Sequence, residues 1–313
     1  MKCILFCCHS SSLHLAQQML KKKLLVGIVV PSKAVEFHQH ISFLAKLSNV
    51  DLLITSADEL NDKLLTWLEE RSPDVCIVNT FSYLLPKMVI DVPKYGTWNF
   101  HGGKLPEYRG PFPLFWQIKQ GVDELTLTLH KMNEFYDAGS IFQETRLKIG
   151  KWDTHDVALN RLAQNASKML GDLLEALPTG DLKLSPQDES KSKFYKKPMM
   201  EDIIIQWNTM SASQILNLVR ACNLSAGGAV AYFRSAEVRV YEVEAVPLTD
   251  PPEAAPGTVA AVGGDPNLYI LCIDSSILRV NVLAVEGVIS SGMNFKKIMD
   301  VATGEKFLSS QEL

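Results

Sequence analysis

The sequence predicts an α/β protein in which the main domain is a doubly wound, mostly parallel sheet and a second, smaller domain is a β-barrel of OB-like type. Short apolar runs rich in β-branched residues alternate with amphipathic segments up to about residue 177, which is typical of a Rossmann-like sheet. After residue 203 the pattern changes to closely spaced short strands, which predict the barrel. A length of 313 residues agrees, since it is about twice that of a common domain.

The elements of the first half follow from apolar runs, which predict strands, and from apolar residues three or four apart, which predict helices. Ser11 or Ser12 is the expected N-cap of the first helix, and Pro31 closes the second strand. Strand, helix and strand at this spacing predict right-handed crossovers and parallel pairing. The expected strands span residues 3–8, 24–30, 51–54, 75–79 and 97–101, and the expected helices span residues 11–22, 35–47 and 58–71.

A long helix leads to the boundary between the two expected domains. Extended runs at 125–132 and 140–147 precede this helix, which Asp153 or Thr154 caps and which ends near Leu177. Its apolar residues, every three to four positions, form one stripe that faces the sheet. We expect a first domain at 1–185, a linker at 186–202 and the barrel domain at 203–313, with a helix at 211–222 and strands at 236–246, 257–262, 268–272 and 277–283.

Charge and composition exclude several classes of function. The net charge is −4, and residues 203–313 hold 7 Lys and Arg against 11 Asp and Glu, so the first 202 residues are balanced. Neither half has the basic field that nucleic-acid-binding proteins use. No apolar run approaches the roughly 18 to 20 residues of a membrane span. Six cysteines without a CxxC pattern favour neither a disulfide framework nor a zinc site, so we expect a cytoplasmic protein.

The densest chemistry lies in residues 99–111, NFHGGKLPEYRGP. Asn99 and His101 stand two apart at the end of an expected strand, so their side chains share a face at the edge where open α/β sheets bind ligands. Asp137 follows in a turn between two expected strands. An imidazole, an amide and a carboxylate together suit acyl transfer. The residues alone leave a plainer interpretation open, in which His101 is a satisfied polar side chain and the other two residues form turns.

Two ordered motifs carry a resemblance to a known family. The first is N-x-H-x-x-x-L-P-x-Y-R-G at residues 99–110, and the second is D-x-G-x-I at residues 137–141. Together they resemble the signature of the formyltransferases that use 10-formyltetrahydrofolate, a family that includes methionyl-tRNA formyltransferase and the sugar N-formyltransferases. Residues 81–86 resemble the family's folate-pocket segment, although alone they also suit a buried strand end and turn. Residues 205–229 and 256–259 resemble parts of its C-terminal barrel domain.

The resemblance implies roles for the matching residues, with Asn99, His101 and Asp137 as the catalytic set. Gly103-Lys104 departs from the family's common Ser-Leu, which affects substrate contacts near the site. Separately, the turn at residues 9–12 lies at an expected helix N-terminus, which suits an anionic group, although such a turn needs no ligand. The expected ligand contacts are Phe81, Tyr83, Leu84, Leu85, Phe135 and Tyr136 for the folate and Ser10, Ser11, Lys104 and Arg109 for the substrate.

The implied reaction is attack of a primary amine on the formyl carbon of 10-formyltetrahydrofolate. We expect the adjacent carboxylate to raise the pKa of the His101 imidazole from its usual value of about 6.5. Such a group is suited to take the amine proton and return it to folate N10. Asn99 Nδ2 is expected to donate to the oxyanion, a contact typically worth about 3 kcal/mol. The reaction requires no metal, and no cluster of metal-ligating residues is evident in the sequence.

Charge also narrows the choice of acceptor. Transfer RNA presents one phosphate per nucleotide, whereas the barrel half is net negative and the second strand runs directly into the helix at 35–47 without a basic insertion. We therefore expect a small-molecule amine, either an amino sugar nucleotide or an amino-acid-like amine, and no nucleic acid or membrane partner. Methionyl-tRNA remains the alternative acceptor. A formyltetrahydrofolate hydrolase and a non-catalytic folate-binding module also remain open.

Overall fold

The computed structural model describes residues 1–223, 227–247 and 253–310, and its internal contacts divide the chain into two compact units. Unit 1 comprises Met1–Pro113, Glu124–Lys148 and Leu159–Lys196. Unit 2 comprises Leu114–Asp123, Ile149–Ala158 and Lys197–Leu313. Each unit therefore takes residues from more than one stretch of the sequence.

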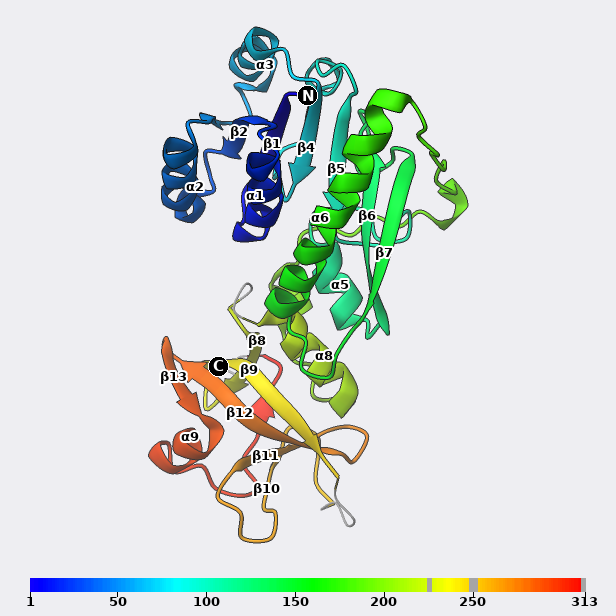
Figure 1. Ribbon diagram of the computed structural model, residues 1–313. Helices are drawn as coiled ribbons and strands as arrows, with labels where there is room; N and C mark the ends of the chain where they lie inside the picture. The colour runs from blue at the N-terminus through cyan, green and yellow to red at the C-terminus, as the bar shows by residue number, and fades with distance from the viewer. Residues whose placement is uncertain (224–226, 248–252, 311–313) are drawn as a thin grey trace. The chain divides into compact units, whose positions relative to one another are not determined.

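Unit 1 contains a sheet of seven strands, β1 (Cys3–Cys7), β2 (Leu25–Pro31), β3 (Asp51–Thr55), β4 (Val75–Asn79), β5 (Thr97–His101), β6 (Glu124–Lys131) and β7 (Ile141–Lys148). Their order across the sheet is β3-β2-β1-β4-β5-β6-β7 (Figure 1). Strands β1 to β5 are parallel, while β6 and β7 are antiparallel to their neighbours. The order reverses between β1 and β4, as in doubly wound sheets, which confirms the predicted fold class.

Helices cover the sheet because its central strands are apolar on both faces. Every residue of β1 and of β4 is buried. Alternate side chains of these strands, Phe6 and Val78 among them, join one hydrophobic cluster with Leu64 and Leu68. The helices that lie wholly or mostly in unit 1 are η1 (Ser10–Ser12), α1 (Leu13–Lys21), α2 (Val35–Ser48), η2 (Leu60–Leu64), α3 (Leu65–Arg71), α4 (Lys87–Ile90), α6 (His155–Thr179) and η3 (Glu189–Lys191).

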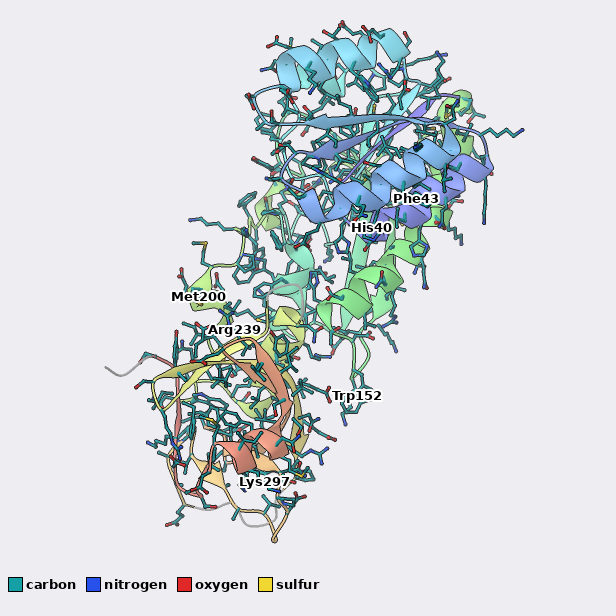
Figure 2. All side chains as sticks on the ribbon, turned by 90° about the vertical axis from the view of Figure 1, so that its left-hand side faces the viewer. His40, Phe43, Trp152, Met200, Arg239 and Lys297 are labelled. Carbon is teal, nitrogen blue, oxygen red and sulfur yellow. The ribbon has the colours of Figure 1, made fainter. Side chains whose placement is uncertain are left out.

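Two of these helices depart from the predictions at their N-terminal ends. Ser12 makes no capping bond, because its hydroxyl donates to the Asn79 carbonyl at the end of β4, 3.2 Å away. His9 Nδ1 instead accepts from the N–H of Ser11. The helix predicted at 58–71 begins at Leu60. Its first five residues form η2, a π-helix, which is wider than an α-helix, and α3 follows directly. Helix α2 agrees with the prediction and has an exposed face, on which Figure 2 labels His40 and Phe43.

Unit 2 holds a second sheet whose pairs are all antiparallel. Its strands are β8 (Ala229–Phe233), β9 (Ala236–Val246), β10 (Val259–Ala260), β11 (Leu268–Leu271), β12 (Ile277–Val285), β13 (Val288–Ser291) and β14 (Phe307–Leu308). The order is β10-β11-β12-β9-β8-β14, with β13 paired to β12, which is the barrel-like arrangement predicted. Its helices are α5 (Pro113–Lys119), α7 (Met200–Ile203), α8 (Ala212–Cys222) and α9 (Gly292–Ile298).

Several short elements of unit 2 differ from the predictions. The strand predicted at 257–262 is only Val259–Ala260. Strands β8, β13 and β14 and helix α9 were not predicted. Strand β14 has only two residues and β13 only four, whereas β8 is a five-residue apolar run that the sequence analysis did not assign. All six cysteines are free. Among the described residues, no helix is both long and apolar enough to span a bilayer.

Candidate active site

The candidate site lies at the carboxyl ends of the central strands of unit 1. Asn99 is the third residue of β5 and His101 is its last, so both lie at the carboxyl end of the strand, as predicted. Strand β4 runs parallel on one side and pairs Val78 with Asn99. Strand β6 runs antiparallel on the other side and places His130 directly opposite Asn99. The loop from β6 to β7 then returns Asp137 to the same edge of the sheet.

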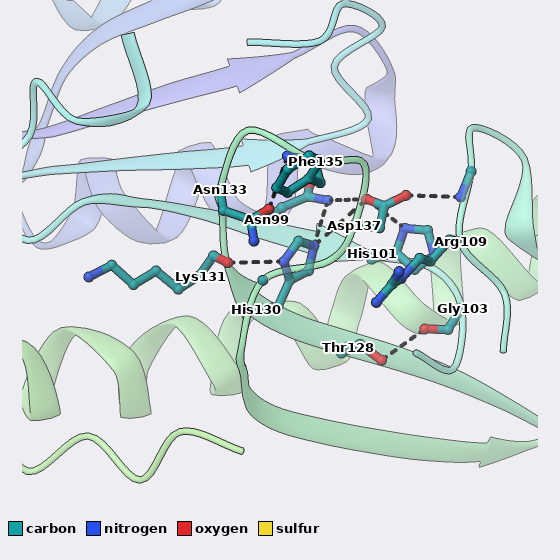
Figure 3. Close-up of polar contacts among 12 residues, drawn as sticks. Asn99, His101, Gly103, Arg109, Thr128, His130, Lys131, Asn133, Phe135 and Asp137 are labelled. Atoms are coloured by element: carbon teal, nitrogen blue, oxygen red, sulfur yellow. Dashed lines mark hydrogen bonds and ion pairs between the residues drawn. The ribbon is translucent and has the colours of Figure 1, made fainter. Parts of the chain in front are cut away.

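The three side chains assigned to the catalytic set converge on one carboxylate (Figure 3). Asp137 Oδ1 lies 3.3 Å from Asn99 Nδ2, which donates to it, and 3.5 Å from His101 Nδ1. The other oxygen, Oδ2, accepts from the backbone N–H of Gly110 at 2.9 Å. The fold therefore brings together the three side chains that the family resemblance singles out, with Asn99 and His101 both within 3.5 Å of the same carboxylate oxygen.

The orientation of the His101 ring comes from a backbone carbonyl rather than from the carboxylate. His101 Nε2 lies 2.6 Å from the carbonyl oxygen of Tyr108. Because a carbonyl can only accept, Nε2 carries the hydrogen, and Nδ1 is the basic nitrogen of the neutral ring. That nitrogen faces Asp137, so a proton taken up there forms an ion pair with the carboxylate. The ring is 6% exposed, and the site therefore offers a sheltered proton acceptor.

Burial sets the pKa of the two central groups in opposite ways. Desolvation lowers the pKa of His101 from 6.5 and outweighs the Asp137 charge and the Tyr108 carbonyl, which would raise it. The expectation of a raised pKa is therefore wrong in sign. For Asp137 burial alone would raise the pKa, but the two histidines and the Gly110 N–H together hold it well below its usual range. At neutral pH the pair is a neutral base beside a carboxylate.

His130 is a member of the site that the sequence analysis missed. Its Nδ1 donates to the Lys131 carbonyl at 3.3 Å, so Nε2 accepts from Asn99 Nδ2 at 3.2 Å. Both N–H groups of Asn99 are thus engaged, one by His130 and one by Asp137, whereas the sequence analysis expected this amide to meet an oxyanion. The signal that would have found His130 is the β5–β6 register, which no tight turn specifies in the sequence.

The folate segment predicted at residues 81–85 follows β4 at the same edge of the sheet. Phe81 packs edge-on against Phe6, with ring centroids 5.2 Å apart, and against Tyr83 at 5.6 Å. Leu85 is 1% exposed and belongs to the core, so its side chain serves packing. Leu84 is exposed and Tyr83 is partly exposed. The segment thus offers outward-facing apolar surface at the adjacent residues Tyr83 and Leu84.

The second predicted folate contact lies on the loop that carries Asp137. Phe135 is 67% exposed and Tyr136 is 53% exposed. The Tyr136 ring meets Phe194, with centroids 5.8 Å apart. Large aromatic rings left this open to solvent are available to a flat ligand.

The four predicted substrate contacts have protein partners or lie away from the catalytic set. Arg109 is 8% exposed, and its guanidinium donates to Gln187 and Glu189. Lys104 pairs with Glu107 at 2.5 Å. Ser10 and Ser11 form η1 after β1, two strands from β5, where Ser10 is exposed and the Ser11 hydroxyl bonds to His9. The structure therefore brings Arg109 close to the Asp137 loop, but through other protein groups.

One surface hollow of unit 1 lies away from this site. This hollow, of about 370 Å³, lies near the amino end of β4 and is lined by Glu69, Ser72, Pro73, Asp74, Val92 and Lys94. The convergent polar groups lie at the opposite, carboxyl ends of the strands. Across the described residues there is no group of three or more His, Cys, Asp or Glu side chains placed to hold a metal ion. The chemistry of the cluster, rather than its volume, marks it as the site.

Comparison with known proteins adds independent findings. Residues 18–174 match the family described as formyl transferase, and residues 199–300 match the family described as formyl transferase, C-terminal domain. Among solved structures, HypX from Aquifex aeolicus in complex with tetrahydrofolic acid is 18% identical, with a TM-score of 0.65, over 98% of this chain and 48% of HypX. The chain therefore spans about half the length of HypX.

Two further structures match over nearly their full length. WlaRD, a sugar 3N-formyltransferase solved in the presence of dTDP and 5-N-formyl-THF, is 14% identical, with a TM-score of 0.67, over 92% of this chain and 98% of WlaRD. The N-formyltransferase from Helicobacter canadensis, in complex with folinic acid and dTDP-3-aminofucose, is 13% identical, with a TM-score of 0.66, over 90% of this chain and 99% of its own. At these identities the likeness establishes a shared fold.

Proposed function

Because the chain belongs to the formyl transferase family, we propose that it transfers a formyl group from 10-formyltetrahydrofolate to a primary amine of a small molecule. The observation that carries the proposal is the contact between His101 Nδ1 and Asp137 Oδ1, 3.5 Å apart, beside Asn99. A neutral base that gains an ion-pair partner on accepting a proton is what amine attack on a formyl group requires. As part of the proposal, residues 1–185 form the catalytic domain, 186–202 the linker and 203–313 the barrel domain of a cytoplasmic enzyme.

The proposed reaction moves one formyl group and one proton. The neutral amine nitrogen forms a bond to the formyl carbon, whose C=O electrons move to the oxygen. His101 Nδ1 takes the amine proton, and Asp137 stabilises the imidazolium. The oxygen electrons then re-form the C=O bond as the bond from carbon to folate N10 breaks, and His101 returns the proton to N10. The products are the N-formyl amine and tetrahydrofolate.

Asn99 is the proposed donor to the oxyanion of the tetrahedral intermediate. Its two N–H contacts are long, at 3.2 Å to His130 and 3.3 Å to Asp137. An imidazole nitrogen is a weaker acceptor than a carboxylate, so the Asn99 N–H that faces His130 is the one to be released toward a developing negative charge. Contacts of this kind are commonly loose before substrate binds. His130 would then hold the amide in place between turnovers.

The folate would lie against the apolar surface at this edge of the sheet. Tyr83 and Leu84 present outward faces on one loop, and Phe135 and Tyr136 present them on the other. These surfaces fit a flat pterin, whose polar edge would pair with backbone groups at the strand ends. The similar structures named above were solved with folates, which supports the same choice here.

The proposed acceptor is an amino sugar nucleotide or an amino-acid-like amine. WlaRD and the Helicobacter canadensis enzyme were solved with dTDP or a dTDP-linked amino sugar, and both resemble this chain over nearly their whole length. A net charge of −4 and the acidic residues 203–313 disfavour methionyl-tRNA. Transfer to tRNA and hydrolysis of the formyl donor are the competing functions.

A mass-spectrometric screen of amines with 10-formyltetrahydrofolate is expected to show one formyl gain on a small amine. Methionyl-tRNA should react poorly, because the protein lacks the cations that would release counterions from the phosphates. Efficient formylation of methionyl-tRNA with a KM that rises steeply with salt would contradict the choice of acceptor. Formate released at the same rate without any amine would identify a hydrolase instead.

The pH dependence of the reaction is expected to report a base with a lowered pKa. Below the pKa of the amine, log kcat/KM falls with a slope of about one, because less amine is neutral. Protonation of His101 should steepen this slope to about two, and burial places the break below the ordinary value of 6.5. Rates measured from pH 5 to pH 9 test this. A break above 6.5 would mean that the Asp137 charge, rather than burial, controls the base.

A further inference from the structure

Residues 185–196, named the strap below, bond to the loops of the candidate active site. At one end Ser185 exchanges two backbone hydrogen bonds of 2.8 Å with Ile141, just beyond the Asp137 loop. At the other end the Arg109 N–H donates to the Lys193 carbonyl at 3.0 Å, and the Tyr195 N–H donates to the Arg109 carbonyl at 2.9 Å. The strap therefore pairs both with the chain that follows the Asp137 loop and with the loop whose Gly110 N–H binds the Asp137 carboxylate.

Gln187 lies between these ends and uses both atoms of its amide. Its Nε2 donates to the carbonyl oxygens of Asp137, at 2.7 Å, and of Gly139, at 2.8 Å. Its Oε1 accepts from Arg109 Nε at 3.2 Å and Nη2 at 2.7 Å. One side chain thus joins the loop that carries the carboxylate to the loop that supplies the Gly110 N–H.

The Asp137 loop needs such support because its backbone is unusual. Asp137 has a φ of 49°, in the left-handed region that non-glycine residues rarely adopt. At Gly139 an added Cβ would lie 1.6 Å from the Lys131 carbonyl oxygen, so the chain there is tightly confined. Gly110 lies close against the strap, since a Cβ added there would lie 2.1 Å from the Tyr195 carbonyl oxygen. Small movements of the strap therefore reach Asp137 from two sides.

We propose that Gln187 is a positioning residue, which holds the Asp137 loop through its two carbonyls so that the carboxylate faces His101. This deepens the proposed function and rests on it. The role belongs to the Nε2 donor, because the Oε1 acceptor serves Arg109, which Glu189 also binds. A displacement of about 1 Å in a reacting group costs roughly 10²-fold in rate, so the effect on kcat is measurable.

Three variants separate the donor from the acceptor. Gln187→Glu keeps an oxygen that accepts from Arg109 and loses the N–H groups that donate to the Asp137 and Gly139 carbonyls. Gln187→Met has a side chain of similar size that can neither donate nor accept in this way. Glu189→Gln removes the carboxylate charge that binds the Arg109 guanidinium and leaves the bonds from Gln187 to the Asp137 loop in place. We expect kcat to fall about 10- to 100-fold in both Gln187 variants, with the KM for the formyl donor changed less than threefold, and to stay within threefold of wild type in Glu189→Gln.

An NMR titration of the His101 imidazole provides a readout that does not depend on transfer. The charges that act on this ring are Asp137, His130 and Arg109, of which only the carboxylate raises its pKa. If Gln187→Met lets the carboxylate recede, the His101 midpoint should move to lower pH. Wild-type protein that transfers no formyl group would refute the proposed function but leave this shift testable. Wild-type kcat in Gln187→Glu, equal losses in Glu189→Gln, or an unmoved midpoint in folded Gln187→Met would each overturn the proposal.

Discussion

Replacing His101 with glutamine is expected to lower kcat by about 10²- to 10⁴-fold, the usual worth of a general base. Glutamine retains an N–H near the position of Nε2, so the bond to the Tyr108 carbonyl is preserved while the basic nitrogen that faces Asp137 is lost. His101→Ala should lose a similar factor. Because neither change alters the apolar surfaces proposed for the folate, binding of 10-formyltetrahydrofolate, measured by calorimetry, should remain within a few-fold of wild type.

A second histidine of the same domain provides the control. His40 is exposed on α2, which connects β2 to β3, and these strands lie three and four places from β5 in the sheet. His40→Ala should therefore retain wild-type kcat. Should His101→Gln and His101→Ala both keep full activity, proton transfer by this imidazole would be excluded. If folate binding disappears along with activity, the ring instead belongs to the binding surface.

Much of unit 1 could be predicted because its signals are local. Strand β4 is a buried and mostly apolar run, and in β5 the aromatic residues Trp98 and Phe100 alternate with polar ones. The observed bounds of both strands equal the expected ones. The family resemblance was also local, since the two motifs that carry it are short and ordered in sequence. Unit 2 was predicted less well, because β10 and β14 have only two residues each and depend on partners distant in sequence.

The contacts that complete the site could not be predicted, because they depend on register and on chain return. His130 meets Asn99 only through the β5–β6 pairing. Gln187 lies in a polar, Ser- and Lys-rich stretch whose composition indicates a linker, yet it bonds to the Asp137 loop 50 residues earlier. The direction of the His101 pKa was also misjudged, because sequence reveals the neighbouring carboxylate but not the depth of burial.

Replacing Asp137 with asparagine is expected to reduce kcat about 10³- to 10⁴-fold. This loss exceeds the effect of removing the negative charge alone, because the new amide also blocks the basic nitrogen of His101. The new carbonyl oxygen can still accept from the Gly110 N–H. The new amide nitrogen then faces His101 Nδ1 and donates to it, which occupies the lone pair that must take the amine proton. The same change removes the negative charge that stabilises the imidazolium, so base and counter-charge are lost together.

Comparison with Asp137→Ala tests this account of the asparagine variant. Alanine removes the counter-charge but leaves His101 Nδ1 open to the amine, so Asp137→Ala should be no slower than Asp137→Asn, whereas a purely structural carboxylate predicts that the isosteric asparagine is the better enzyme. Asp58→Asn, an exposed site in the same unit, should retain wild-type kcat. Asparagine activity well above alanine activity, with equal Tm, would show that Asp137 holds the loop and takes no part in the proton transfer.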